Sequence, residues 1–199
     1  KPETRDAVLA AAHQLAADLR AQRAWDERIT VDVDTRDLPG GTKNWEWIKK
    51  GVPLRVEIGP RDLEKGTVAV ARRDAGVKEK SFPTMAEFTA GAVGLLEEIQ
   101  AGLLAKATAF RDAHMVRIDS ADDFRAFFAD KATAESADKA AGGFALVHWA
   151  GTGDDENRLR EELKVTIRCV PFGDEFAEEG PCFLTGQPSH RRVVFAKSY

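Results

Sequence analysis

Aromatic and basic side chains are interleaved between Lys43 and Arg73, a pattern that suits contact with an unpaired nucleic acid. Trp45 and Trp47 flank a single glutamate, and lysines and arginines follow them at short intervals. Aromatic rings stack on unpaired bases, and cationic side chains hold the neighbouring phosphates. In the alternative interpretation one tryptophan belongs to the core and the charges form an ordinary solvated face. Residue types alone do not decide between the two.

Other chemical centres find little support in the sequence. Cys169 falls in an expected strand, where a small thiol is commonly buried, and a small Cys/His hydrolase is a remote alternative because a nucleophile needs an adjacent base. The four histidines show no metal-binding spacing. His148 is the one to watch, although a structural role is favoured. No glycine-rich loop has the spacing and following lysine that would bind phosphate.

Length and composition are those of a globular protein with one large domain or two small ones. The 199 residues are 43% hydrophobic and 31% charged, which is enough apolar material for a core. We expect no membrane association, because no apolar run approaches the length of a membrane helix and no signal peptide is recognisable. Two cysteines are too few for a disulfide scaffold, so a reducing cytoplasm is expected.

The net charge of −4 argues mildly against a nucleic-acid-binding protein until its distribution is considered. The segment Lys43–Lys80 holds ten Lys and Arg residues against six Asp and Glu, so it is positive on an otherwise acidic chain. A basic segment of this kind could steer a polyanion towards one face of the protein.

The elements that must position these residues follow an alternating pattern. Apolar residues at helical spacing predict a first helix at 5–22, and capping-box spacing from Thr84 predicts a long one reaching about 113. Expected strands and short helices lie between them, at 29–33, 44–50, 53–58, 60–65, 67–71 and 77–82. This order predicts an α/β sheet covered by helices. Since the chain starts almost at a helix, we expect the first strand of that sheet to precede or overlap residue 1.

The second region is a smaller α/β domain that begins near Val116. Helices are expected at 120–128 and 154–163, and strands at 144–149, 165–170 and 192–196.

From Lys43 to Asp62 the sequence reads KNWEWIKKGVPLRVEIGPRD. It resembles the Lys-Phe-x-x-Trp-x-x-Lys-Gly-Val-Pro-x-Arg-x-Glu-x-Gly-Pro-x-Asp run of class II prolyl-tRNA synthetases, in the form with an additional C-terminal domain. Further matches lie at 72–74, 78–79, 109–111, 166–171 and 193–199. The resemblance therefore covers essentially the whole chain.

The resemblance implies a fold and a division into domains. Residues 1–113 would form the anticodon-binding domain, a mixed five-stranded sheet with flanking helices whose first strand lies just before Lys1. Residues 114–199 would form a smaller α/β C-terminal domain like the zinc-binding-like domain of these enzymes.

The resemblance also implies which residues bind the anticodon. Arg55, Arg61 and Lys78 would face it, with Lys43 and Trp47 completing the site. Guanine presents O6 and N7 acceptors that suit a bidentate arginine, and proline anticodons contain guanines. Many members place Glu at the position of Ile48, where it accepts from guanine N–H groups. An acceptor must then come from elsewhere, such as Glu46 or Glu57, or the recognition of that base is relaxed.

Some relatives bind zinc through four cysteines in the C-terminal domain. The matching positions here are Ala150, Asp155, Cys182 and Thr185. One thiolate cannot build a closed tetrahedral site, so zinc is not expected. Packing must take the place of the metal, and the expected contributors are Trp149, Phe183 and Leu184.

By resemblance, the parent enzyme is a cytoplasmic homodimer that attaches proline to its transfer RNA with ATP and Mg²⁺. That chemistry belongs to an N-terminal catalytic domain, so this chain is expected to hold no catalytic residue and no cofactor. Its expected partners are that catalytic domain and the anticodon stem-loop of proline tRNA. The alternative is a stand-alone protein-interaction module that keeps the fold without binding RNA, which the overall acidity and Ile48 would support.

Overall fold

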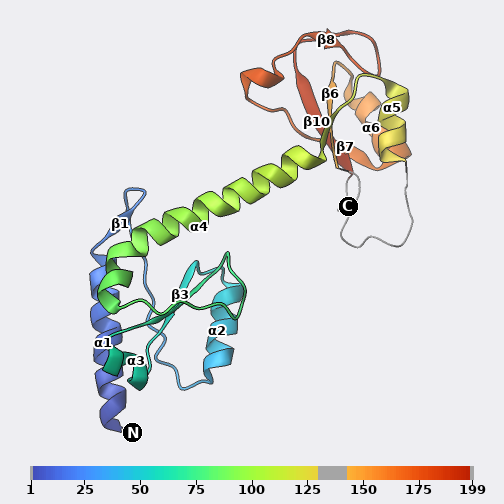
Figure 1. Ribbon diagram of the computed structural model, residues 1–199. Helices are drawn as coiled ribbons and strands as arrows, with labels where there is room; N and C mark the ends of the chain where they lie inside the picture. Colours follow the sequence, from blue (N-terminus) through green and yellow to red (C-terminus); the bar gives the residue numbers. More distant parts are fainter. Residues whose placement is uncertain (1, 130–142, 198–199) are drawn as a thin grey trace. The chain divides into compact units, whose positions relative to one another are not determined.

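The computed structural model describes residues 2–129 and 143–197. Two compact units are apparent from the contacts within the chain, Lys1–Lys106 and Ala107–Tyr199. Helix α4 (Met85–His114) runs from the first into the second (Figure 1). The division by contacts falls inside this helix, whereas the boundary expected from the sequence falls at its end. No helix in the described ranges combines the length and apolar character needed to cross a membrane.

The first unit alternates helices with short strands. In order, its elements are α1 (Pro2–Arg20), β1 (Arg23–Ala24), β2 (Glu27–Arg28), α2 (Gly40–Lys49), β3 (Leu54–Glu57), α3 (Pro60–Lys65), β4 (Ala69–Arg72) and the first part of α4. Pro60 opens α3 where its missing N–H costs nothing, and Gly66 ends it in the left-handed region. The expected α/β class is therefore confirmed, and α1 to α4 lie close to their expected positions.

The regular sheet of this unit is shorter than the five strands expected. β3 pairs antiparallel with β4, from Leu54 opposite Arg72 to Glu57 opposite Ala69. The segment expected as a strand at 77–82 adds only an isolated bridge at Ser81, because a turn closed by the bond from Glu79 N to Gly76 O takes up its first half. Residues 29–33 have no strand partner among the described residues, and the hairpin β1–β2 was not expected.

One face of α1 and the start of α4 cover the strand pair. The buried cluster joins α1, the β4 segment and α4, and consists of Leu15, Leu19, Val68, Val70, Phe88 and Ala92. The spacing that predicted the first helix is thus the spacing of its buried face.

The second unit is built on a four-stranded mixed sheet in the order β5-β6-β10-β7. Its elements are β5 (Met115–Arg117), α5 (Ala121–Phe128), β6 (Phe144–His148), α6 (Gly153–Leu163), β7 (Val165–Cys169), the 3-10 helix η1 (Asp174–Phe176), β8 (Gly180–Pro181), β9 (Pro188–Ser189) and β10 (Arg192–Lys197). β5 runs parallel to β6, while β10 is antiparallel to both neighbours. The expected helices and strands of this region are confirmed, and β5 is an additional edge strand.

A capping box fixes the start of α6. The Asp155 carboxylate accepts from the backbone N–H and the hydroxyl of Thr152, each at 2.8 Å, and the side chain of Arg158 also donates to it. The bonds from Thr152, backbone first, and the bond from Arg158 lower the pKa of Asp155 to about 2. Ionised Asp155 therefore favours the folded state.

We expect acid to remove this contribution in a defined window. A carboxyl whose pKa is depressed by folding stabilises the protein above its unfolded value, near 4, and the stabilisation is lost as the pH falls towards 2. Asp155→Asn should lower the thermal midpoint at pH 6, and the difference from the unmodified chain should shrink as the pH falls from about 4 through 2. The adjacent exposed Asp154→Asn is the matched control in thermal melts, and a deficit of Asp155→Asn that did not change with pH would contradict the assignment.

Candidate nucleic-acid interface

The carboxylate of Asp34 ties α2 to the extended segment that precedes it. It accepts hydrogen bonds from Arg36 Nε at 2.9 Å and Nη2 at 2.7 Å, and from Trp47 Nε1 at 2.9 Å. Lys43 Nζ donates to the carbonyl oxygen of the same residue at 3.2 Å. The bonds from Arg36, and then that from Trp47, hold the pKa of Asp34 well below its usual range. The residue therefore stays charged and positions two of the five expected site residues.

The edge and one face of the Trp47 ring are already in contact with other side chains of the protein. Its ring is half-buried, its N–H is bonded to Asp34, and Lys50 Nζ lies 4.2 Å from the ring centroid. Trp45, by contrast, keeps 54% of its surface exposed, and neither tryptophan belongs to a core cluster of the described residues.

The three remaining expected residues keep their positive charges free of carboxylate partners. Arg55, half-buried on β3, donates from Nε to the side-chain oxygen of Asn44 at 2.7 Å. Arg61 on α3 and Lys78 are exposed, and no hydrogen bond or ion pair joins either of them to any part of the chain that the structure describes. Arg72 differs, since it pairs with Asp74 at 2.9 Å and Glu98 at 2.8 Å.

A groove of about 760 Å³ brings three of the five expected residues together. It lies between α1, the extended residues 29–34, α2 and β3, and Lys43, Trp47 and Arg55 line its wall. Arg61 and Lys78 are not part of that lining. The groove is lined on one side by residues 29–34 and on another by β3.

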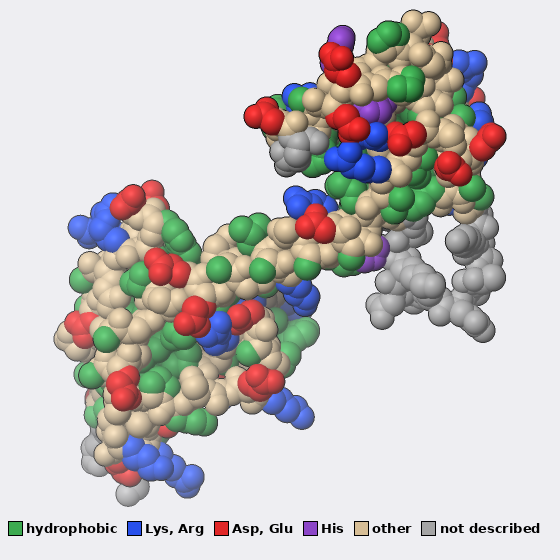
Figure 2. All heavy atoms as spheres, turned by 45° about the horizontal axis from the view of Figure 1, so that its top comes forward, with side chains coloured by type: hydrophobic (Ala, Val, Ile, Leu, Met, Phe, Trp, Pro, Cys, Tyr) green, Lys and Arg blue, Asp and Glu red, His purple; other side chains and the backbone are tan. Residues whose placement is uncertain are grey.

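The surface charge is mixed rather than of one sign. On the face shown in Figure 2, Lys and Arg side chains are interspersed with Asp and Glu. Both carboxylates considered as substitutes at the Ile48 position are paired, Glu46 with Arg36 at 2.8 Å and Glu57 with Lys80 at 2.7 Å. Neither is a free acceptor in this conformation.

The positions that match zinc ligands in some relatives do not fit a metal site. Asp155 is engaged in the α6 capping box. Burial raises the pKa of Cys182, but hydrogen bonds from the Thr185 hydroxyl and the Ala150 backbone outweigh it and lower the pKa. Only one of the four matching positions carries a thiol, whereas a structural zinc site needs four ligands. Within the described residues, no group of three His, Cys, Asp or Glu is arranged to hold a metal.

Neither candidate for other chemistry forms a catalytic pair. Cys169 is exposed, contrary to the expectation of a buried thiol, because β7 lies at the edge of the sheet and, among the described residues, pairs with β10 alone. His148 is buried, and its Nδ1 has no partner among the described atoms. Burial, followed by the nearby charge of Arg192, lowers the pKa of His148, as fits a structural histidine.

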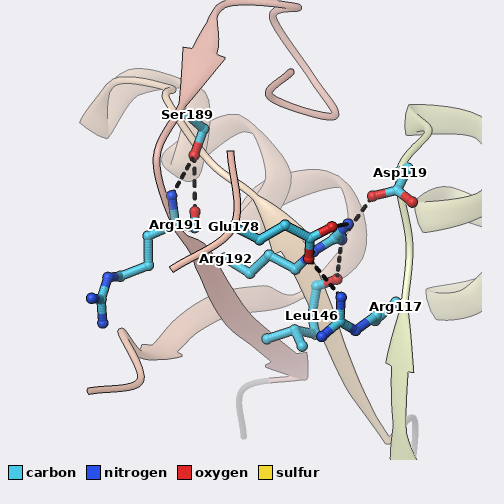
Figure 3. Close-up of polar contacts among 7 residues, drawn as sticks. All are labelled: Arg117, Asp119, Leu146, Glu178, Ser189, Arg191 and Arg192. Atoms are coloured by element: carbon cyan, nitrogen blue, oxygen red, sulfur yellow. Dashed lines mark hydrogen bonds and ion pairs between the residues drawn. The ribbon is translucent and has the colours of Figure 1, made fainter. Parts of the chain in front are cut away.

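The second unit contains an ion cluster centred on Arg192, which the sequence did not single out (Figure 3). Arg192 is only 4% exposed, and it binds Asp119 at 2.7 Å, Glu178 at 2.9 Å and the carbonyl oxygen of Leu146 at 3.2 Å. Arg117 also donates to Glu178. The guanidinium is fully engaged by its own unit, so we assign it a structural role.

Two family models match the chain. The anticodon binding domain matches residues 2–87, and the C-terminal domain of prolyl-tRNA synthetase matches residues 135–199. Among curated relatives, proline–tRNA ligase 2 of Anaeromyxobacter dehalogenans is 48% identical over 201 residues, and proline–tRNA ligase of Akkermansia muciniphila is 42% identical over 200. Each alignment covers 100% of this chain but only 39% and 38% of those proteins.

A solved structure gives the same picture. Prolyl-tRNA synthetase of Giardia lamblia, determined in complex with prolyl-adenylate, superposes with a TM-score of 0.69 at 26% identity. The match covers 100% of this chain and 39% of that one.

The Arg192 cluster leads to an asymmetric prediction about stability. Removing Glu178 leaves the buried guanidinium short of a partner, whereas removing Arg192 leaves acids that water can reach, since Asp119 and Glu178 side chains are 67% and 42% exposed. Glu178→Ala should therefore lower the denaturation midpoint more than Arg192→Met, whose cost should stay below about 1 kcal/mol because an apolar side chain of similar size fills the site. Urea denaturation measures both midpoints. A larger loss in Arg192→Met than in Glu178→Ala would contradict the prediction and show that the packing of the Arg192 side chain matters more than its ion pairs.

Proposed function

Because the chain belongs to the prolyl-tRNA synthetase family, of whose members it spans a C-terminal part, we propose that its first unit binds the anticodon arm of proline tRNA. The observation that carries the proposal is the state of Arg55, whose charge lies at the groove with an amide, not a carboxylate, as its partner. A guanidinium held this way keeps its remaining donors for a base or a phosphate.

Each proposed residue has a role that its environment supports. Arg55 and Arg61 would donate to O6 and N7 of anticodon guanines. Lys78, exposed on a turn, would contact a phosphate. Lys43 and Trp47 are bound to Asp34 and would form the fixed wall against which the loop rests.

The activity of the whole protein is a wider proposal, because the chain spans only 39% of the length of the first curated relative. We infer that the complete protein attaches proline to its tRNA in an ATP- and Mg²⁺-dependent reaction at a separate N-terminal catalytic domain. It would act as a homodimer in the cytoplasm. Residues 1–113 would contribute the anticodon-binding domain and 114–199 the C-terminal domain, without zinc.

Binding of a proline-tRNA anticodon stem-loop, followed by fluorescence anisotropy at several salt concentrations, tests the proposal. Arg55→Ala and Arg61→Ala should each weaken binding by about 1–3 kcal/mol, roughly 5- to 150-fold, and should reduce the preference for guanine. Lys78→Ala should weaken binding of all sequences alike and reduce the salt dependence by about one phosphate contact.

Arg5→Ala is the charge-matched control, since Arg5 is an exposed arginine on α1 outside the basic segment. If the unmodified chain and Arg5→Ala both fail to bind the stem-loop at low salt, RNA binding is excluded for this chain. The protein-interaction module would then be the remaining interpretation.

A further inference from the structure

Trp45 is an exposed aromatic residue that the fold does not use. It keeps 54% of its surface accessible in the middle of α2, and no core cluster of the described residues includes it. Lys49, one turn later, places Nζ 5.8 Å from the ring centroid. A large ring facing water beside a cation is the arrangement that stacks on nucleic-acid bases.

The position of Trp45 on α2 relates it to Arg55. At about 3.6 residues per turn, Asn44, Ile48, Trp45 and Lys49 follow one another around the helix. Asn44 holds the Arg55 side chain at 2.7 Å and lines the groove, so it marks the edge of the helix nearest the arginine. Ile48 comes next, and Trp45 and Lys49 extend the same strip outwards.

Ile48, Trp45 and Lys49 have no side-chain hydrogen-bond acceptor for a base. Ile48 has an aliphatic side chain, and Glu46 and Glu57 are held in ion pairs with Arg36 and Lys80. A carboxylate in an ion pair must give up that partner before it can accept from guanine N–H groups. A ring, an aliphatic side chain and a cation are what the strip offers, and these contact the face of a base and a phosphate.

We propose that Trp45 stacks on an unpaired base of the bound RNA, with Lys49 at a neighbouring phosphate, so that this one contact tolerates any base. The inference rests on the proposed anticodon-arm function and adds a specificity rule to it. Arg55 and Arg61 read guanine edges, whereas the base over Trp45 is held without regard to its identity. Trp47 does not serve this purpose, because its N–H and one face are engaged by Asp34 and Lys50.

The test uses stem-loops in which each anticodon position in turn carries guanine, inosine or another base. Stacking on an aromatic residue contributes about 1–3 kcal/mol per base, so Trp45→Ala should weaken binding roughly 5- to 150-fold for every stem-loop. Trp45→Phe should recover most of the loss, because phenylalanine retains a stacking face. At one position the parent chain should bind guanine and inosine alike, although inosine lacks the 2-amino donor.

Ile48→Glu supplies the missing acceptor and should create a preference for guanine over inosine at that position. Trp25→Ala is the matched control, since Trp25 is 58% exposed on the β1–β2 turn and should leave binding unchanged. Circular dichroism of each variant checks that the overall helix content is unchanged.

The possible outcomes separate this inference from the proposed function. Loss of binding in Arg55→Ala with none in Trp45→Ala overturns the role of Trp45 and leaves anticodon binding standing. Discrimination by the parent chain between guanine and inosine at every position overturns the tolerance rule. Absence of stem-loop binding in the parent chain overturns both.

Discussion

Competition between acidic side chains and RNA for the same cations is the constraint on which the candidate interface depends. The chain carries more acidic than basic residues, so a cation is available to a polyanion only where the fold keeps carboxylates away from it. Arg36 and Arg72 each lie between two acids, and Lys80 is paired with Glu57. Arg55 is not neutralised in this way, because its hydrogen-bond partner is the neutral side-chain amide of Asn44. Pairing, rather than net charge, therefore decides which cations of the candidate interface are available.

Asp34 shows how the hydrogen bonds of one half-buried carboxylate can organise such a surface. By accepting from Arg36 and Trp47, it orients one side of α2 towards the groove and leaves Trp45 on the outer strip. The sequence indicated that two tryptophans shared this helix but not which of them would be exposed. That outcome depends on a carboxylate 13 residues before Trp47, and pairings at such separation leave no local periodicity to detect.

The same distinction between local and non-local information explains what the sequence predicted of the fold. The helices were recognisable because their apolar spacing and caps are local, as in α1 and α6. The strands expected at 144–149, 165–170 and 192–196 were recognisable from their apolar, β-branched composition, and each has a partner in the four-stranded sheet, as β6 has in β10. Residues 29–33 have strand-like composition but no partner among the described residues, and composition cannot supply one. The candidate site residues were proposed from the family resemblance, and the structure adds the hydrogen-bond partners of Lys43, Trp47 and Arg55.

Aromatic packing connects the segment around Cys182 to the core of the second unit. Trp149, Phe183 and Leu184, the residues expected to replace zinc, all pack on the buried cluster around Phe124 and Phe195. The rings of Phe124 and Phe183 stack with their centroids 4.4 Å apart. Because Phe183 directly follows Cys182, this contact joins the turn that carries Cys182 to the core. The Cys182 thiol is itself held by Thr185 and the Ala150 backbone, two of the positions that match zinc ligands. Local hydrogen bonds and adjacent aromatic packing thus connect this turn to the rest of the second unit.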